Sequence, residues 1–368
     1  MQHKLGDKTL LSVVLMLLTF GLVMIASAGV IYSETRFGDS YYFFKHQFFY
    51  GVIPGLLAMW FFQKIDYHYW RKVAVPFFFL AIIFLILVFV PGIGSRVYGA
   101  SRWLQLGPFS FQPSEMAKLA VIIYLAAWLE SRGAHRIKDV FEGLLPFLGI
   151  MGLVGLLIMK QPDTGTFGVI AFTSFAIFFI SGARFNHLFS MAGLGALGLW
   201  ILVKIEPYRF NRILAFLDPG ADPQGIGYQI NQALLAIGSG GLFGLGLGHS
   251  RQKFNYLPEP VGDSIFAVIG EEVGFIGAAI LVTLFLMLAL RGIKIAKNAP
   301  DMFGRLMATG ITVWIIMQAF INIGANIALI PLTGIPLPFI SYGGTSLVFL
   351  LSSIGILLNI SKQSNLEN

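Results

Sequence analysis

The chain has 368 residues, of which 56% are hydrophobic and only 12% are charged. Soluble domains carry about twice that share of charged residues, so the composition argues against a soluble globular enzyme. The formal net charge is +7, but the basic residues stand singly or in pairs and form no long run, which argues against a nucleic-acid partner. The lack of cysteine excludes disulfides, thiolate metal sites and a cysteine nucleophile.

Apolar stretches dominate the chain. A helix that crosses the hydrocarbon core of a membrane needs about 20 mostly apolar residues. The first stretch is too long for a signal-peptide core, and we interpret it as an uncleaved helix. The sequence predicts an all-α polytopic integral membrane protein with about ten spans: 10–31, 43–62, 73–91, 115–130, 143–159, 165–181, 186–203, 264–290, 307–330 and 341–360.

The placement of Lys and Arg in short loops predicts the orientation of these spans. With the N-terminus in the cytoplasm, the inside segments hold fourteen such residues and the short outside segments hold five. Both termini are therefore expected inside, and the large loop 204–263, between spans seven and eight, outside. A structureless loop of this length would be unusual, so we expect a folded cap or a re-entrant element there.

Ionisable groups inside membrane helices are costly and usually mark function. Glu115 and Lys118 stand three residues apart at the start of the fourth span, on one face of the helix. They form either a pair that neutralises itself near the membrane surface, or a phosphate-binding lysine that the glutamate orients. Asp163, at the outer end of the fifth span, is a further acid beside a proline.

The eighth span begins next to Asp263, where the helix dipole favours a carboxylate, although a simple capping acid would also stand there. Small residues recur along this span every three or four positions, from Ala267 to Ala278, and predict tight packing against a neighbouring helix. Glu271 and Glu272 lie about two turns deeper. At least one of them must be paired, protonated or in contact with a wet cavity.

The ninth span carries a polar stripe, because Gln318, Asn322 and Asn326 recur every four residues. Such a stripe either joins helices, at about 0.6 kcal/mol per contact, or lines a polar cavity. With Glu271 and Glu272 also in need of partners, we favour the cavity.

Several long segments resemble the SEDS (shape, elongation, division and sporulation) family of bacterial cell-wall polymerases. They are QPSEMAKLA, KQPDTGT, the run from RILAFLDPG to GEEVGFIG, and LTGIPLPFISYGGTSL. The resemblance extends from the first span to the last and is greatest to the cell-division branch. It implies a peptidoglycan glycosyltransferase that polymerises lipid II into a glycan strand on the outer face of the bacterial cytoplasmic membrane, at the division septum. It also implies a class B penicillin-binding protein as the transpeptidase partner, with other division proteins, and no nucleic acid.

The resemblance also implies roles for individual residues. The family's essential acid corresponds to Asp263, although Val261-Gly262 replaces the His-Thr or Gln-Thr of many relatives. The family's Glu and Lys of the fourth span correspond to Glu115 and Lys118, and its QPD acid corresponds to Asp163.

The implied reaction joins two lipid-linked sugars. The 4-hydroxyl of one attacks C1 of the other, which carries a polyprenyl pyrophosphate, and C1 is inverted. A carboxylate that removes the hydroxyl proton contributes about 10²–10⁴-fold. We expect Asp263 to be this base, with a pKa raised towards neutrality by partial desolvation or by a nearby glutamate.

The departing pyrophosphate requires fixed cations around it. The candidates on the outer face are Lys118, Arg102, Arg209 and Arg212, in that order. A divalent cation, Mg²⁺ or Mn²⁺, could share this role, although the sequence contains no evident ligand cluster, and no other cofactor is expected.

Three alternatives remain open at this stage. A lipid II flippase would use the polar stripe and the two glutamates as a translocation path, although the inverted repeats that favour a transporter are not evident. A scaffold protein would only recruit a synthase. Within the family, the chain would instead be the elongation polymerase.

Overall fold

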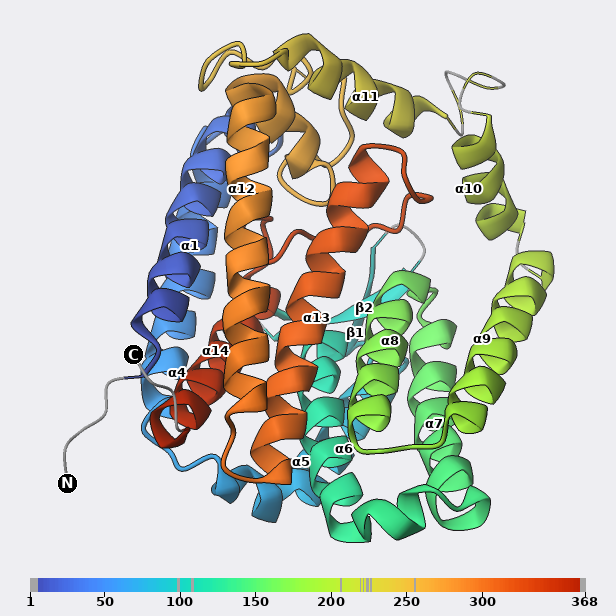
Figure 1. The fold of residues 1–368 in the computed structure, drawn as a ribbon. Coiled ribbons are helices and arrows are strands. Elements are labelled where there is room, and N and C mark those ends of the chain that lie inside the picture. Colours follow the sequence, from blue (N-terminus) through green and yellow to red (C-terminus); the bar gives the residue numbers. More distant parts are fainter. Residues whose placement is uncertain are drawn as a thin grey trace.

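The computed structural model describes residues 6–97, 100–106, 109–205, 207–218, 220, 222, 225, 227–254 and 256–364. Helices make up most of this part and run largely side by side (Figure 1). The first group of helices is α1 (Lys8–Ala28), α2 (Val30–Phe37), α3 (Tyr42–Gln47), the π-helical turn η1 (Phe48–Val52), α4 (Ile53–Phe62), α5 (His68–Leu87), α6 (Pro113–Ile137) and the π-helical turn η2 (Val140–Leu144). The second group is α7 (Leu145–Lys160), α8 (Thr164–Ile180), α9 (Phe185–Ile205), α10 (Pro207–Leu217), α11 (Tyr228–Gly240), α12 (Ile265–Lys297), α13 (Met302–Asn326) and α14 (Gly344–Gln363).

Helices overlap all ten predicted stretches, most of them with bounds that shift by a few residues. Seven helical segments in the described part of the chain are long and apolar enough to cross a membrane: Lys8–Ala28, His68–Leu87, Val140–Lys160, Phe185–Lys204, Ile265–Lys297, Met302–Asn326 and Gly344–Gln363. The apolar helix α8 is shorter, at 17 residues. This architecture is that of a polytopic, predominantly α-helical membrane protein.

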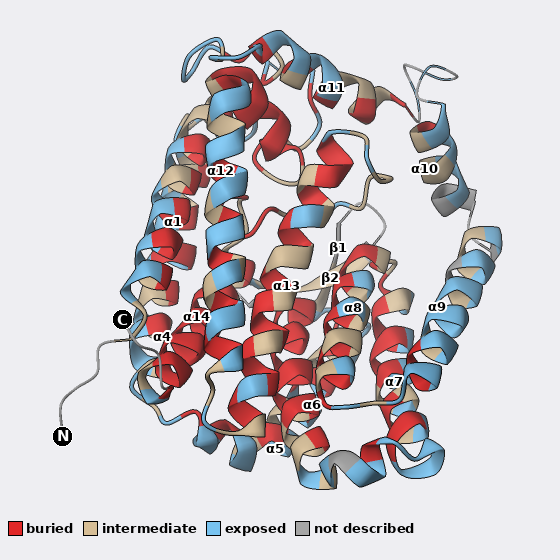
Figure 2. Cartoon of the chain, viewed as in Figure 1, coloured by how far each residue is buried: buried red, intermediate tan, exposed pale blue. Residues whose placement is uncertain are grey.

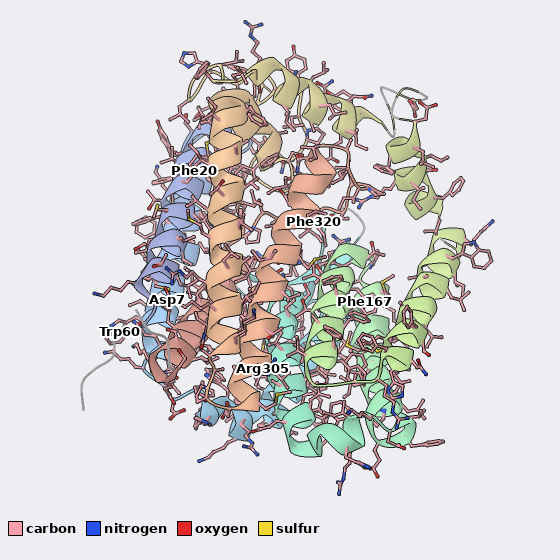
Figure 3. The ribbon with its side chains drawn as sticks, in the orientation of Figure 1. Asp7, Phe20, Trp60, Phe167, Arg305 and Phe320 are labelled. Carbon is pink, nitrogen blue, oxygen red and sulfur yellow. The ribbon has the colours of Figure 1, made fainter. Side chains whose placement is uncertain are left out.

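The exposure of the side chains is also that expected of a membrane protein. The outer faces of α1, α9 and α12 are exposed, whereas α6, α13 and α14 are largely buried (Figure 2). Many of the exposed side chains are large and apolar, such as Trp60, Phe79 and Leu290. Water would penalise such surfaces, so these faces are suited to lipid. Figure 3 shows that α13 crosses most of the bundle, from Arg305 near one end to Phe320 towards the other.

Three of the helices begin at an aspartate that caps the first turn. Asp7, Asp163 and Asp301 accept hydrogen bonds from backbone amides three residues later. These caps satisfy amides that have no partner within the helix. Asp163 therefore has a structural role at the start of α8, whatever else it does.

The all-α prediction missed a small antiparallel sheet. Strands β1 (Gly94–Val97), β2 (Ala100–Leu106) and β3 (Phe109–Phe111) pair in that order. Leu104 of β2 lies opposite Gly94 on one side and Phe111 on the other. The segment SRWLQL does not alternate regularly between polar and apolar residues, so the sequence carries no clear strand signal there.

The segment predicted as a large outer loop contains α10 and α11. These helices lie at one end of the bundle (Figure 1). Gly240 of α11 allows close packing on α12, since an added Cβ would lie 2.0 Å from the carbonyl oxygen of Gly270. The segment is thus a folded element in its described part.

The eighth predicted span is not one straight helix. Within α12, Gly274 has φ 67° and ψ −171°, which breaks the helix. Residues 265–272 before the break are all buried, whereas the side chains of Phe275 and Ile276 after it are exposed. Backbone amides of Leu245 and Gly246 bind the carbonyls of Glu271 and Glu272 at the break. The small residues before Gly274 therefore serve a buried, broken segment rather than a continuous lipid-spanning helix.

Close packing of α14 on α4 yields a stability prediction. A Cβ at Gly355 would lie 2.6 Å from the carbonyl oxygen of Met59, whereas one at Gly195 of α9 would meet nothing within 4 Å. We expect Gly355→Ala to destabilise the protein by about 1–3 kcal/mol through overpacking, and Gly195→Ala to have little effect. Thermal unfolding in detergent measures both variants. Equal unfolding temperatures for the two would contradict this packing.

Candidate active site

Asp263 stands two residues before α12, and two asparagine side chains of α13 bind its backbone. The side-chain amides of Asn322 and Asn326 each donate to the carbonyl oxygen of Asp263, at 2.8 Å. Asn322 also donates to the carbonyl of Ile335, at 2.8 Å. Both asparagines are buried. The polar stripe of α13 therefore fixes the backbone that carries Asp263.

The loop between α13 and α14 holds the same segment from a second side. The Ser341 hydroxyl donates to the carbonyl of Gly262 at 2.7 Å, and the Tyr342 amide donates to that of Val261 at 2.8 Å. Ser341 also accepts the amide of Leu337. Asp263 is thus positioned by a backbone clamp, which we define as Asn322, Asn326, Ser341 and the amide of Tyr342.

Glu115 and Lys118 form a buried ion pair of 2.8 Å, in which the two side chains are 2% and 4% exposed. The Lys118 ammonium also donates to Gln318 Oε1 at 3.0 Å. Gln318 in turn donates to the carbonyl of Pro336 at 3.0 Å. The pair is therefore linked to the clamp through α13 and the following loop. This geometry fits the self-neutralised pair, and phosphate binding by Lys118 stays a prediction.

The six residues predicted to surround one polar cavity do not lie together. Asn322 and Asn326 donate their side-chain amides to the carbonyl of Asp263, whereas Gln318 donates to that of Pro336. Asp163 caps α8. Glu271 and Glu272 instead bind the loop that follows α11 and Ser27 of α1. The stripe does not join helices either, because its side-chain amides donate to backbone carbonyls of the loops before α12 and after α13.

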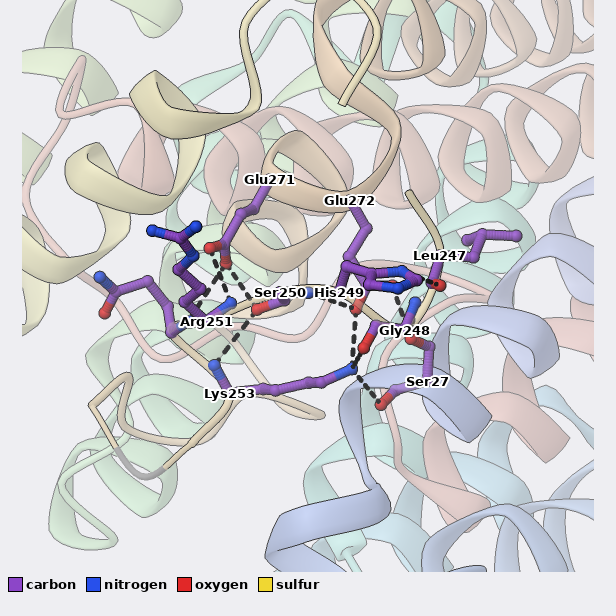
Figure 4. Close-up of polar contacts among 10 residues, drawn as sticks. Ser27, Leu247, Gly248, His249, Ser250, Arg251, Lys253, Glu271 and Glu272 are labelled. Atoms are coloured by element: carbon purple, nitrogen blue, oxygen red, sulfur yellow. Dashed lines mark hydrogen bonds and ion pairs between the residues drawn. The ribbon is translucent and has the colours of Figure 1, made fainter. Parts of the chain in front are cut away.

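Glu272 is the centre of a buried polar cluster at the break in α12 (Figure 4). It accepts the Ser27 hydroxyl at 2.5 Å and pairs with Lys253 at 3.1 Å. The ammonium of Lys253 also donates to the carbonyl of Gly248 at 2.7 Å. The cluster ties α1 to the loop that follows α11.

Glu271 binds the same loop through its carboxylate. It accepts the Ser250 hydroxyl at 2.5 Å and the Arg251 amide at 2.9 Å. Together the two glutamates have three hydroxyl or ammonium partners and several amides, so the requirement that they be paired is met. Their contacts hold the residues just before the break in α12 to α1 and to the loop that follows α11.

Arg102 and Arg212 both bind backbone carbonyls. Arg102 of β2 donates to the carbonyls of Gln161, at 3.1 Å, and Pro162, in the turn that leads to Asp163. Arg212 of α10 donates to the carbonyl of Leu332 at 2.9 Å. The side chain of Arg209 lies outside the described part of the chain. Pyrophosphate binding by any of the three stays a prediction.

A cavity of about 400 Å³ opens between α10, α11 and the loops before α12 and after α13. Arg212 and Gln229 line it, together with Asn211, Ala215, Gly225, Tyr228, Ile230, Pro258 and Leu332. Gln229 donates to the hydroxyl of Ser264, the neighbour of Asp263, at 3.1 Å. The volume is within the range of small-molecule sites, and the cavity is therefore the candidate substrate site.

The Asp263 carboxylate is partly exposed, but its Oδ1 atom is buried and has no hydrogen-bond partner among the described residues. Burial, followed by the negative charge of Glu259, raises the pKa of Asp263 to about 6, while Gln229 and Arg212 act in the opposite direction. Gly334, with φ 72°, lies beside Oδ2 and has no side chain to cover it. The carboxylate is thus ionised at neutral pH and basic enough to accept a proton.

Sequence reasoning missed several members of this site. No local sequence pattern marks Gln229 or Ser341 as part of the site, because their contacts with the Asp263 segment depend on how distant loops fold together. Glu259 stands four residues before Asp263 in LPEPVGD, and this spacing is the one clue that the sequence offers.

The sequence of the chain matches a known protein family over almost its whole length. Residues 8–366 match the model of the FtsW/RodA/SpoVE family, described as cell cycle protein. The chain belongs to this family. The resemblance to the SEDS polymerases is therefore confirmed.

Two curated relatives cover nearly the whole chain. Stage V sporulation protein E of Bacillus subtilis (strain 168) is 45% identical over 358 residues, which are 97% of each chain. A protein of Geobacter sp. (strain M18), named probable peptidoglycan glycosyltransferase FtsW, is 42% identical over 355 residues, 96% of each chain.

Two solved structures share the fold. A chain from work on the structural coordination of polymerization and crosslinking by a peptidoglycan synthase complex matches with a TM-score of 0.80 and 29% identity, over 98% of this chain and 99% of that one. The rod shape determining protein RodA of Thermus thermophilus matches with a TM-score of 0.71 and 28% identity, over 98% of each.

The buried pair of α6 leads to a prediction that separates its two interpretations. Lys118→Met leaves Glu115 buried without its cation, and we expect a loss of about 3–5 kcal/mol in stability. The double variant Glu115→Gln/Lys118→Met removes both charges and should regain most of that loss. Thermal unfolding in detergent measures stability, and a glycan-polymerisation assay measures activity.

A double variant that is stable and active shows that the pair is structural. A double variant that is stable but inactive shows that the pair takes part in the reaction and is not merely structural. If the double variant is as unstable as Lys118→Met, the self-neutralised pair is wrong.

Proposed function

We propose that the chain is a peptidoglycan glycosyltransferase that polymerises lipid II into glycan strands on the outer face of the bacterial cytoplasmic membrane. The observation that carries this proposal is the Asp263 carboxylate. Its Oδ1 atom is buried without a hydrogen-bond partner among the described residues, and Arg212 and Gln229, which act on this carboxylate, line the candidate cavity. The names of the relatives support the reaction, and the family membership supports the assignment of this acid.

The proposed step needs one base and one cationic region. The 4-hydroxyl oxygen of one sugar bonds to C1 of the other sugar, and Asp263 takes the proton that this hydroxyl loses. The bond from C1 to the pyrophosphate breaks at the same time, and polyprenyl pyrophosphate leaves with the bonding electrons. A base works best when its pKa is near the working pH, and a pKa of about 6 meets that condition.

Arg212 is the cation best placed for the departing pyrophosphate. It lines the cavity, and its charge acts on Asp263. Lys118 is less accessible because it is buried against Glu115 and Gln318. The described residues contain no group of three or more His, Asp or Glu side chains that could hold a metal ion. A Mg²⁺ or Mn²⁺ ion stays a prediction, because such ions often bind through one or two carboxylates together with the phosphates of the substrate.

The partner is proposed to be a class B penicillin-binding protein, which supplies the transpeptidase. The matching synthase complex, which coordinates polymerization with crosslinking, supports this pairing. We place the activity in cell division, at the septum, on the strength of the relatives named FtsW. The contacts favour the polymerase over a flippase, because Asn322 and Asn326 bind a backbone carbonyl and Glu272 is paired with Lys253.

The base assignment is tested by reconstitution with the penicillin-binding partner on lipid II. We expect Asp263→Asn to lower the initial rate of glycan formation by about 10²-fold or more, since the amide cannot take the proton. Asp218→Asn, at an exposed acid in the same outer segment, should polymerise like the wild type. Gel analysis of the glycan products over time gives the initial rate for the wild type and both variants.

Two outcomes would contradict the proposal. Polymerisation by Asp263→Asn at the wild-type rate would exclude this residue as the base. Accumulation of outer-leaflet lipid II in liposomes, without any glycan from the wild type, would instead indicate a flippase.

A further inference from the structure

A second carboxylate, Glu259, stands in the turn that leads to Asp263. The carbonyl of Glu259 accepts the amides of Gly262, at 3.0 Å, and Ser264, at 3.4 Å, so the chain from 259 to 264 folds tightly upon itself. Glu259 has φ 47°, in the left-handed region that residues with a side chain rarely adopt. Strain of this kind persists where the surrounding structure enforces it, and it is frequent at functional sites.

The side chain of Glu259 is fixed from another helix. The Tyr32 hydroxyl of α2 donates to Glu259 Oε1 at 3.1 Å. The Tyr32 ring is itself held, since it stacks on Phe43 with centroids 5.5 Å apart and lies 4.3 Å from the guanidinium carbon of Arg36. The glutamate therefore has a defined position in a half-buried environment next to the proposed base.

We propose that Glu259 is a positioning residue for Asp263, which Tyr32 holds so that its negative charge faces the catalytic carboxylate. This role rests on the proposed function and deepens it. Glu259 need not touch the substrate, because it acts on how strongly Asp263 holds a proton. The strained turn fits the same role, since it places Oε2 of Glu259 3.6 Å from where a Cβ of Gly262, the neighbour of Asp263, would lie.

The charged and titratable groups around Asp263 define what the glutamate must oppose. Arg212 of α10 lowers the pKa of Asp263, as does the hydrogen bond from Gln229 of α11. Asn322 and Asn326 of α13 are neutral and bind the backbone. On the remaining side, Tyr342 binds the backbone of Val261 and its hydroxyl contacts His46. Among the described residues, the negative charge of Glu259 adds to burial in raising the pKa of Asp263.

The sign of the effect follows from the reaction. Asp263 acts as a base only when it is ionised, so the rate falls as the pH drops through its pKa. Without the negative charge of Glu259 the proton is held less strongly, and the fall moves to lower pH. The rate at neutral pH also decreases, because a weaker base removes the hydroxyl proton less effectively.

The experiment measures initial rates of lipid II polymerisation from pH 5 to pH 8 with the full chain and its penicillin-binding partner. We expect Glu259→Gln to move the acid limb to lower pH by roughly half a unit or more. Tyr32→Phe should move it in the same direction by less, and Glu259→Asp should lie between Glu259→Gln and the wild type. Glu34→Gln is the matched control, since Glu34 lies on α2 and is exposed, with Ser40 as its partner.

An unchanged acid limb in both Glu259→Gln and Tyr32→Phe would overturn the proposal, even if their maximal rates fall. If Glu259→Gln does not fold, Tyr32→Phe decides, since it retains the ring. A second measurement is independent of activity: infrared titration of ¹³C-carboxyl-labelled aspartate, with Asp263→Asn to assign the band. If the wild type makes no glycan, the proposed function fails, and this titration still shows whether Glu259 controls the protonation of Asp263.

Discussion

Two hydrogen bonds from α13 to a single backbone carbonyl determine the geometry of the site. Asn322 and Asn326 both donate to the carbonyl of Asp263. In a lipid environment an unsatisfied amide or carbonyl costs several kcal/mol. Breaking these buried hydrogen bonds is therefore strongly unfavourable. The contacts fix the direction in which the carboxylate leaves the chain, which a general base requires.

The surrounding structure supports this arrangement from three sides. The loop after α13 binds the carbonyls of Val261 and Gly262. The cluster of Glu271, Glu272 and Lys253 ties the break in α12 to α1. The turn at Glu259 is anchored on α2. Backbone groups that are buried outside regular helices need hydrogen-bond partners, and these contacts supply them around Asp263 and at the break in α12.

The sequence predicted the parts of this account that depend on local pattern. Apolar runs marked the helices because lipid requires long apolar segments, and Asp263 emerged from its place before the eighth span together with the family motifs. The partners of the α13 stripe were not predictable, because the spacing of Asn322 and Asn326 shows a shared face but not what that face meets. The break at Gly274 was not predictable, because its positive φ occurs where the distant loop 241–246 binds the backbone on both sides of it.

The central claim is that the α13 amides hold Asp263 in the orientation that catalysis needs. The most direct measurement is the initial rate of lipid II polymerisation by a double variant, Asn322→Ala/Asn326→Ala, that remains folded and still binds the penicillin-binding partner. A misplacement of about 1 Å can cost about 10²-fold in rate, and we predict a loss of that order. A double variant with the wild-type rate would contradict the account.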